Sequence, residues 1–141
     1  MRYKIPVQII ELDPGNYHMI VDAVFPDGKI KKWVIDTGAS KSVFDQNLEK
    51  YYSTGLNETE ELYSAGISDS PLKTTFGHLG SFSFGDLRVE NMKVALLDLT
   101  HINNLYLNAT DIKICGLLGG DFLMKHKSEI DYKRKRIVFT G

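Results

Sequence analysis

Cysteine is almost absent from this sequence, since the 141 residues contain only Cys115. A single cysteine excludes an intrachain disulfide and a cysteine-rich zinc site, and its place in an apolar run indicates a small core residue. The histidines are scattered without the spacing of metal ligands; they are His18, His78, His101 and His126. We therefore expect neither a metal ion nor another cofactor.

Long apolar runs and an excess of charge of one sign are lacking too. No stretch reaches the roughly 18–20 apolar residues of a membrane-spanning helix, and no apolar segment follows the first residues as in a signal peptide. The formal net charge is −1, so the sequence offers no general attraction for a polyanion such as nucleic acid. These absences predict a cytoplasmic protein whose partners are neither nucleic acids nor membranes.

The length and composition are those of an ordinary folded domain. The chain is 43% hydrophobic and 25% charged, which is typical of a protein that folds around a core. A chain of this size can bury such a core without disulfides or metals. Because domains commonly have about 100–150 residues, we expect residues 1–141 to form a single domain.

Short alternating apolar runs, separated by turn signals, dominate the sequence. Residues 17–35 alternate on both sides of Pro26-Asp27-Gly28, which predicts a hairpin. Further strands are expected at 5–9, 42–44, 77–84, 87–97, 112–118, 128–132 and 136–140, with a long hairpin at 62–75. Short helices are expected at 46–51, after Asp45 as a cap, and at 121–127, whereas 53–61 and 101–111 are expected to be loop or irregular. Many short strands and at most two short helices indicate an all-β barrel or sandwich.

The segment most suggestive of chemistry is Asp36-Thr37-Gly38-Ala39-Ser40, which follows an apolar strand. Gly38 and the small residues around it allow a tight turn and the close approach of a second loop, which the Thr37 hydroxyl could fix by a hydrogen bond. Such a turn places the carboxylate of Asp36 rigidly at the floor of a cleft. Asp-Xaa-Gly also occurs in plain strand-ending turns and in phosphate-binding loops, so both alternatives stay open on spacing alone.

A rigid carboxylate suits peptide hydrolysis if a second carboxylate joins it. Hydrolysis needs an activated water and a proton for the leaving nitrogen. Two carboxylates ~3 Å apart cannot both ionise, so that one of them keeps a proton. The ionised carboxylate then accepts a proton from water, and the protonated one polarises the carbonyl group of the substrate.

Two segments resemble the motifs of retropepsin-like aspartic peptidases, a family that includes the retroviral proteases. The stretch around Asp36 resembles the active-site signature of the family. About 80 residues later, Leu117-Leu118-Gly119 matches its hydrophobic-hydrophobic-Gly motif, and Asp121 follows where the family's short helix begins. In the family this second motif threads through the loop that carries the catalytic Asp. The phosphate-loop alternative has no explanation for the second motif, and the expected role of Asp121 is capping or pairing within the scaffold.

The resemblance implies a closed, all-β acid-protease barrel with one or two short helices, acting as an aspartic endopeptidase on a peptide or protein substrate without a cofactor. Each chain of a homodimer would supply one catalytic Asp, and this sequence has a single Asp-Thr-Gly, at Asp36. Thr37 would match the residue that hydrogen-bonds across the dimer, and backbone groups of Gly38 and Ala39 would help to position the substrate or the carboxylates. The candidate for the family's flap is Tyr63, Ser64, Ala65, Gly66 and Ile67.

Two alternatives on the same fold remain. The chain could be a peptide-binding or dimerisation module with weak or no catalytic activity, because its candidate flap lacks the dense glycine pattern of retroviral flaps. It could also be a monomer in which the lone Asp36 forms no pair. Cleavage assays separate the first alternative from an active peptidase, and sedimentation separates the second.

Overall fold

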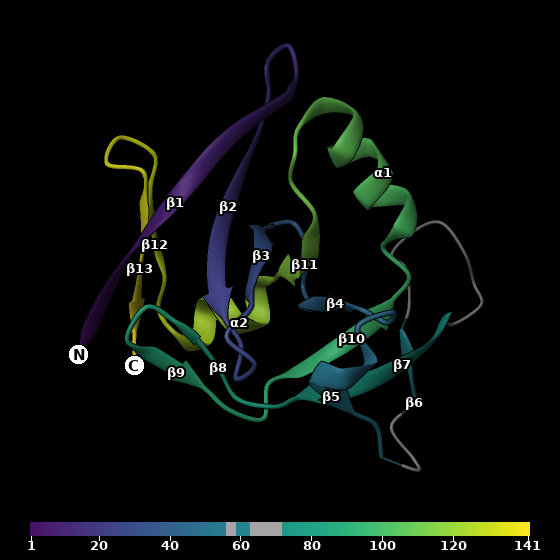
Figure 1. Cartoon of the computed structure of the whole chain (residues 1–141). Coiled ribbons are helices and arrows are strands. Elements are labelled where there is room, and N and C mark those ends of the chain that lie inside the picture. Colours follow the sequence, from purple (N-terminus) through teal and green to yellow (C-terminus); the bar gives the residue numbers. More distant parts are fainter. Residues whose placement is uncertain (56–58, 63–71) are drawn as a thin grey trace.

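The computed structural model describes residues 1–55, 59–62 and 72–141 (Figure 1). Strands dominate it, and within these residues helical structure is confined to α1, α2 and one turn of 3₁₀ helix at Glu49–Tyr51. The elements are β1 (Arg2–Asp13), β2 (Asn16–Val24), β3 (Ile30–Ile35), β4 (Val43–Asp45), β5 (Tyr52–Ser53), β6 (Thr59–Leu62), β7 (Leu72–Leu79), β8 (Phe82–Phe84), β9 (Leu87–Val89), β10 (Lys93–Leu97), α1 (Thr100–Ala109), β11 (Ile114–Leu118), α2 (Gly120–Lys125), β12 (Glu129–Asp131) and β13 (Arg136–Thr140).

Hydrogen-bonded strands lie in the order β12-β13-β1-β2-β3-β11-β4-β10-β7-β5. Most neighbours are antiparallel, but β11 runs parallel to β3, and β10 runs parallel to β4. The first parallel pair places Leu118 beside Ile35 and Leu117 beside Val34, so the ends of two strands that are far apart in sequence lie side by side. The expected all-β class is confirmed, and closure of the sheet into a barrel stays a prediction.

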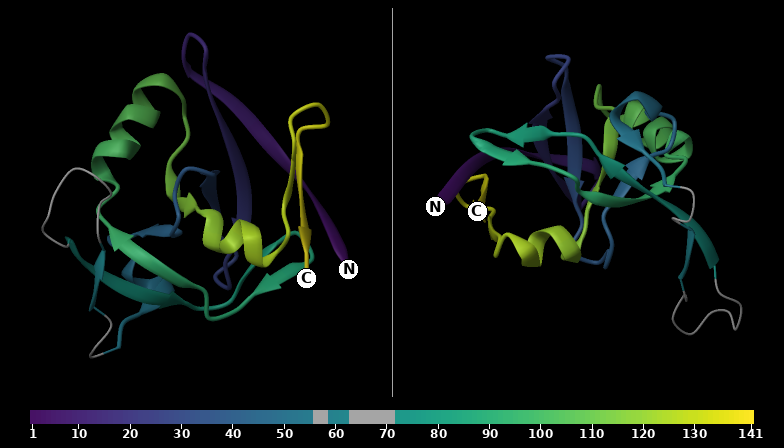
Figure 2. Two further views of the ribbon diagram at one scale, coloured as in Figure 1. Left: turned by 180° about the vertical axis from the view of Figure 1, so that it is seen from behind. Right: turned by 90° about the horizontal axis from the view of Figure 1, so that it is seen from below.

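The two ends of the chain lie together, as both views in Figure 2 show. β13 pairs with the first half of β1, starting with Arg2 opposite Thr140, and the N–H of Gly141 donates to the carbonyl of Met1 at 3.1 Å. From Val7 onward β1 pairs with β2 instead. The far half of the β1–β2 hairpin therefore extends beyond the terminal strands, toward the side where α1 lies (Figure 1).

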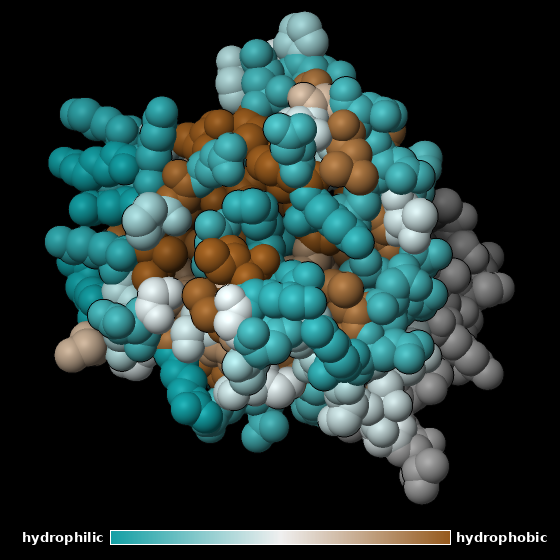
Figure 3. All heavy atoms as spheres, in the orientation of Figure 1, coloured by the Kyte–Doolittle hydropathy of each residue, from teal (hydrophilic) through white to brown (hydrophobic). Residues whose placement is uncertain are grey.

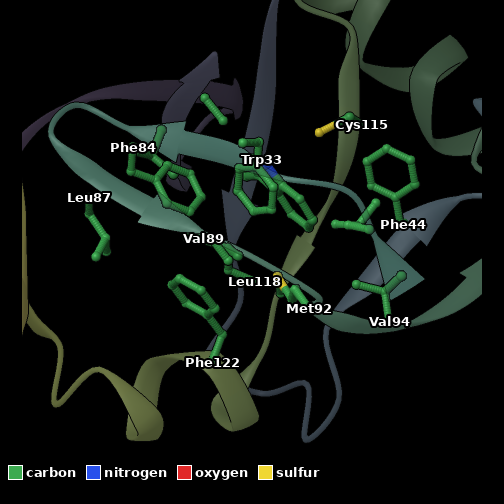
Figure 4. Packing of buried hydrophobic residues seen from close by; sticks show 14 of the residues in the cluster. Trp33, Phe44, Phe84, Leu87, Val89, Met92, Val94, Cys115, Leu118 and Phe122 are labelled. Atoms are coloured by element: carbon green, nitrogen blue, oxygen red, sulfur yellow. The ribbon is translucent and has the colours of Figure 1, made fainter. Parts of the chain in front are cut away.

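An aromatic core lies on one side of β3 (Figure 4). Trp33, Phe44 and Phe84 are fully buried, with ring centroids 5.6 Å apart for Trp33–Phe44 and 6.4 Å apart for Trp33–Phe84. Burial of each large apolar side chain contributes about 1.5–3 kcal/mol. Gly116 lets β11 approach this core, because a Cβ there would lie 2.8 Å from the Trp33 ring. Since successive strand residues point to opposite faces, Trp33 anchors β3 in the core while Val34 faces the other side.

The expectation of irregular chain at 101–111 is wrong, because residues 100–109 form α1. Asp98 favours the start of this helix, since its carboxylate accepts hydrogen bonds from the N–H (3.0 Å) and the hydroxyl (2.6 Å) of Thr100. The buried Asn103 joins the helix to β11: its amide donates to the Ile114 carbonyl at 3.1 Å, and its oxygen accepts from the Ile114 N–H at 2.8 Å. Polar residues such as Asn103 make this segment less hydrophobic, which favoured the expectation of irregular chain. In the structure, however, Asn103 is part of the packing between α1 and β11.

Boundaries differ from expectation in three further places. The expected helix at 46–51 shortens to one 3₁₀ turn, because Asp45 ends β4 and its carboxylate accepts from the N–H groups of Asn47 (3.2 Å) and Leu99 (3.3 Å). The expected loop at 53–61 includes parts of β5 and β6. The expected strands at 77–84 and 87–97 each divide in two, since β8 pairs with β9 whereas β7 pairs with β10. The hairpins at 17–35 and 128–140, the strand that ends at Leu118 and the short helix after Gly119 are confirmed.

Candidate active site

The loop that carries Asp36 leaves the end of β3 and folds back on itself. The N–H of Gly38 donates to one carboxylate oxygen of Asp36 at 3.0 Å, and the N–H of Ala39 donates to the Asp36 carbonyl at 3.2 Å. Asp36 is partly exposed, whereas Thr37, Gly38 and Ser40 are exposed. The carboxylate is therefore held by the backbone of its own loop and still reaches solvent.

Gly38 has more room within this chain than the sequence pattern predicted. A Cβ at Gly38 would lie 3.4 Å from the nearest atom, an Asp36 carboxylate oxygen, which is ordinary van der Waals contact. The turn of a single chain thus tolerates a side chain at this position.

The second motif lies directly beneath the loop. The N–H of Asp36 donates to the Leu118 carbonyl at 2.9 Å, and the N–H of Gly120 donates to the Ala39 carbonyl at 2.7 Å. Leu118 is fully buried. A Cβ at Gly119 would lie 2.8 Å from the Ala39 carbonyl oxygen, so only glycine fits between β11 and the loop. The structure therefore brings together the two segments, Asp36 to Ser40 and Leu117 to Gly119, that the sequence singled out.

A buried serine closes the far end of the loop. The Ser42 hydroxyl donates to the Asp121 carboxylate at 2.7 Å and accepts from the Gly119 N–H at 2.9 Å. The same Asp121 oxygen accepts from the N–H groups of Ser42 (2.9 Å) and Phe122 (2.8 Å). Asp121 thus has the scaffold role expected of it. Ser42, which sequence reasoning placed only in a strand, joins the loop to α2 through its side chain.

A cavity of about 990 Å³ opens beside Asp36. Its floor is the end of β3 with Leu117 of β11, and its walls are the far half of the β1–β2 hairpin and one face of α1. Figure 3 shows apolar side chains gathered between that hairpin and α1. The cavity is lined by Leu12, Asp13, Asn16, Tyr17, His18, Met19, Val34, Ile35, Asp36, Ile102, Leu105, Tyr106, Asn108, Ala109, Leu117 and Tyr132.

Sequence reasoning missed the contribution of α1 to this cavity. The side chains that α1 supplies include Ile102, Leu105, Tyr106 and Ala109, which follow the spacing i, i+3, i+4 and i+7 of one helical face. That spacing was present in the sequence and would have predicted both the helix and its apolar face.

Tyr106 is the buried polar group of the α1 wall, with only 3% of its surface exposed. Burial, and secondarily the negative charge of Asp36, raises the pKa of Tyr106 to about 12. Its hydroxyl therefore keeps its proton at neutral pH. The hydroxyl lies 2.5 Å from His18 Nδ1, and His18 Nε2 lies 3.2 Å from the Asn16 side-chain oxygen.

Among the described residues, no group of three or more His, Cys, Asp or Glu side chains is placed to hold a metal ion. Cys115 is buried, as expected of a core residue. No helix in the described part of the chain is long and apolar enough to cross a membrane.

The candidate flap, Tyr63 to Ile67, lies outside the described residues. The strands on either side of it, β6 and β7, pair in antiparallel fashion from Thr59 opposite Thr75 to Leu62 opposite Leu72.

Comparison with solved structures defines the class of fold. A retropepsin-like aspartic protease from Rickettsia conorii superposes with a TM-score of 0.54 at 17% sequence identity, over 99% of this chain and 90% of the other. The retroviral protease-like domain of Ddi1 from Leishmania major superposes with a TM-score of 0.53 at 12% identity, over 85% of this chain and 86% of the other. The fold is therefore retropepsin-like, as the two motifs implied.

Sequence comparison then gives the family. The model of a family described as aspartyl protease matches residues 21–122, a range that includes both the Asp36 loop and the second motif. The chain belongs to the aspartyl protease family. No curated protein sequence is significantly similar to it.

Proposed function

We propose that the chain is an aspartic endopeptidase and that Asp36 is its catalytic carboxylate. The observation that carries the proposal is the backbone frame around Asp36. Its carboxylate accepts from the Gly38 N–H at 3.0 Å, and its own N–H donates to Leu118 at 2.9 Å. This frame holds the carboxylate at the edge of a large cavity, where a substrate can reach it.

The proposed chemistry is general acid–base hydrolysis by a pair of carboxylates. The ionised Asp36 of one chain takes a proton from water, which attacks the peptide carbonyl carbon. The protonated Asp36 of a second chain donates to the carbonyl oxygen. Collapse of the tetrahedral intermediate breaks the C–N bond, and the leaving nitrogen takes a proton from the pair.

Three features support a homodimer as the active species. The sequence has a single Asp-Thr-Gly, so a second carboxylate has to come from a second copy. Thr37 and Gly38 are exposed next to Asp36, where a partner's loop would meet them. Gly38 is not required by the turn of one chain, whereas close approach of a partner's loop would require it. We expect the Thr37 hydroxyl to donate across the dimer axis.

The proposed substrate is an extended peptide that lies between the Asp36 loop and a flap. An extended peptide can pair its backbone with a strand edge, as in strand addition. The segment Tyr63 to Ile67 remains the proposed flap, and backbone groups of Gly38 and Ala39 are proposed to contact the substrate or the carboxylates. In this proposal residues 1–141 act as one catalytic domain.

Replacement of Asp36 by Asn tests the assignment with little change in shape. We expect the cleavage of a mixed peptide library to fall by about 10²–10⁴-fold in Asp36→Asn, with the library assayed from acid to neutral pH. Asp86→Asn, in the exposed β8–β9 turn, is the matched control and should cleave like the wild type. Undiminished cleavage by Asp36→Asn would exclude Asp36 as the catalytic residue.

The oligomeric state and the cleavage assay together separate the proposal from its two alternatives. Sedimentation at the assay concentration should give a dimer, and in a structure of the dimer the two Asp36 carboxylates should lie within hydrogen-bond distance. A peptidase that is active as a strict monomer contradicts the paired mechanism. A dimer that binds peptides without cleaving them at any pH is a binding module on the same fold.

A further inference from the structure

A chain of hydrogen bonds crosses from α1 to the β1–β2 hairpin above the Asp36 cavity. The Tyr106 hydroxyl lies 2.5 Å from His18 Nδ1, and His18 Nε2 lies 3.2 Å from the Asn16 oxygen. The two rings also meet edge to face, with centroids 5.6 Å apart at 75°. The contact joins residues that are 88 positions apart in sequence.

The direction of these hydrogen bonds follows from Asn16, whose side-chain oxygen can only accept. His18 Nε2 therefore carries the ring proton and donates it to the Asn16 oxygen. In the neutral imidazole Nδ1 is then the acceptor, so the Tyr106 hydroxyl donates to it. Both ring nitrogens of His18 thus have a hydrogen-bond partner.

Both ends of this chain of hydrogen bonds belong to the cavity that contains Asp36. Tyr106, His18 and Asn16 all line it. The ring of Tyr106 packs in a small apolar cluster with Ile10 and Ile20 of the hairpin. Apolar packing is non-directional, whereas the Tyr106–His18 hydrogen bond fixes one distance between the two walls.

We propose that the Tyr106–His18 hydrogen bond is a latch that sets the width of the cavity beside Asp36 and so selects the peptide side chain that enters it. Tyr106 and His18 are then positioning residues that determine specificity. This inference rests on the proposed peptidase function.

The lining of the cavity indicates which side chains it takes. Its floor is apolar, with Val34 and Leu117, and its charged lining groups are the carboxylates of Asp13 and Asp36. None of the described residues that line it is a Lys or Arg. A large uncharged side chain buries apolar surface there, whereas an acidic one meets like charge in a partly dehydrated site.

The volume of the cavity does not limit the side chain that enters, so we expect the limit to be the width that the latch sets. About 990 Å³ is at the upper end of the ~300–1,000 Å³ of small-molecule sites. A wall that moves outward therefore admits a still larger side chain, and we expect the effect to appear in KM rather than in kcat, because Tyr106 acts on binding and not on the reacting atoms.

The test uses variants that remove the latch and leave the packing. Tyr106→Phe deletes only the hydroxyl, and Tyr52→Phe is the matched control, because it deletes a hydroxyl that donates to the Gln46 carbonyl at 2.6 Å away from the cavity. His18→Asn keeps an oxygen near the place of Nδ1 to accept from Tyr106, whereas His18→Leu does not. Peptides that differ only in one side chain next to the cleaved bond, namely Leu, Trp or Glu, report selectivity.

We expect the ratio of kcat/KM for the Trp peptide to that for the Leu peptide to rise by about 3- to 10-fold in Tyr106→Phe and His18→Leu, through KM. We expect no such rise in Tyr52→Phe and a smaller one in His18→Asn. The Glu peptide should be the poorest substrate of every variant. Equal ratios in Tyr106→Phe and wild type, or a Glu peptide as good as the Leu peptide, would overturn the proposal.

Hydrogen exchange keeps this inference separate from the peptidase proposal. Amides at 11–18 should exchange about 2- to 10-fold faster in Tyr106→Phe than in wild type or Tyr52→Phe. Unchanged exchange shows that there is no latch, even if peptides are cleaved. If the wild-type chain cleaves no peptide, the proposed function and the selectivity claim fail together, while faster exchange in Tyr106→Phe alone still supports the latch.

Discussion

Gly119 is the point at which the second motif passes the Asp36 loop with no space for a side chain. A Cβ at Gly119 would lie 2.8 Å from the carbonyl oxygens of Ala39 and Lys41. The neighbouring Gly120 has space, since a Cβ there would lie 3.6 Å from the nearest atom, the Ala39 oxygen. Alanine at these two adjacent positions adds the same methyl group, and we expect a clash only at Gly119.

The size of the effect follows from what the methyl group meets. The contacts at Gly119 are backbone atoms, which cannot rotate away, and forcing an extra methyl group into a packed site costs about 1–3 kcal/mol. Relief of the clash would stretch the hydrogen bonds from Gly120 to Ala39 (2.7 Å) and from Gly119 to Ser42 (2.9 Å). Each is worth about 0.5–1.5 kcal/mol. We therefore expect Gly119→Ala to lower the free energy of unfolding by about 2–6 kcal/mol.

Urea denaturation of both variants measures this difference. Gly120→Ala should change the free energy of unfolding by less than about 1 kcal/mol, with a gain if alanine favours the first turn of α2. Peptide cleavage at a temperature where both variants are folded should fall in Gly119→Ala only, since the loop that holds Asp36 shifts. Stabilities of the two variants within about 0.5 kcal/mol of each other would refute the close approach of the motif to the loop.

Two further predictions concern other parts of the scaffold. Ser42→Ala leaves the Gly119 N–H without its partner and removes one donor from Asp121, so it should lower the free energy of unfolding by about 1–3 kcal/mol. Ser40→Ala, at an exposed position, is the control, and equal urea midpoints for the two variants would contradict the prediction. Burial lowers the pKa of His126 below its ordinary value of 6.5, so the folded state favours neutral His126. Its contribution to stability is present above about pH 6.5 and is lost as pH falls through the lowered pKa. His126→Asn can still donate to the Thr140 carbonyl. It should therefore lose less stability than the wild type between about pH 7 and pH 5. Parallel plots of the free energy of unfolding against pH for the two proteins would exclude His126 as a source of the pH dependence.

The parts of the fold that follow from local pattern were predicted well. The hairpin around Pro26-Asp27-Gly28 has a strong turn signal between alternating strands, and it is present as β2 and β3. The strand that ends at Leu118 is an apolar run broken by glycines, and it is present as β11. Each of the two signals is contained in a few neighbouring residues, so no distant contact is needed to recognise it.

The errors come where distant contacts decide the local structure. Asn103 favours irregular chain by propensity, but its hydrogen bonds to Ile114 hold α1 against β11. Asp45 resembles a helix cap, yet the Leu99 N–H competes for its carboxylate. The Ile114 and Leu99 partners could not be known before the chain was folded, although the apolar spacing of α1 was a helix signal within the sequence itself.

The sequence by itself determined where the candidate carboxylate lies and which motif accompanies it. Asp36, with its small neighbours, and Leu117-Leu118-Gly119 carry these conclusions, because a tight turn and a glycine-containing strand end impose recognisable residues at fixed spacing. Only the tertiary structure decided what surrounds the carboxylate. The hydrogen bonds between Ser42 and Asp121 and between His18 and Tyr106 join residues 79 and 88 positions apart, and such contacts leave no mark on local composition, since each partner alone is an ordinary polar side chain.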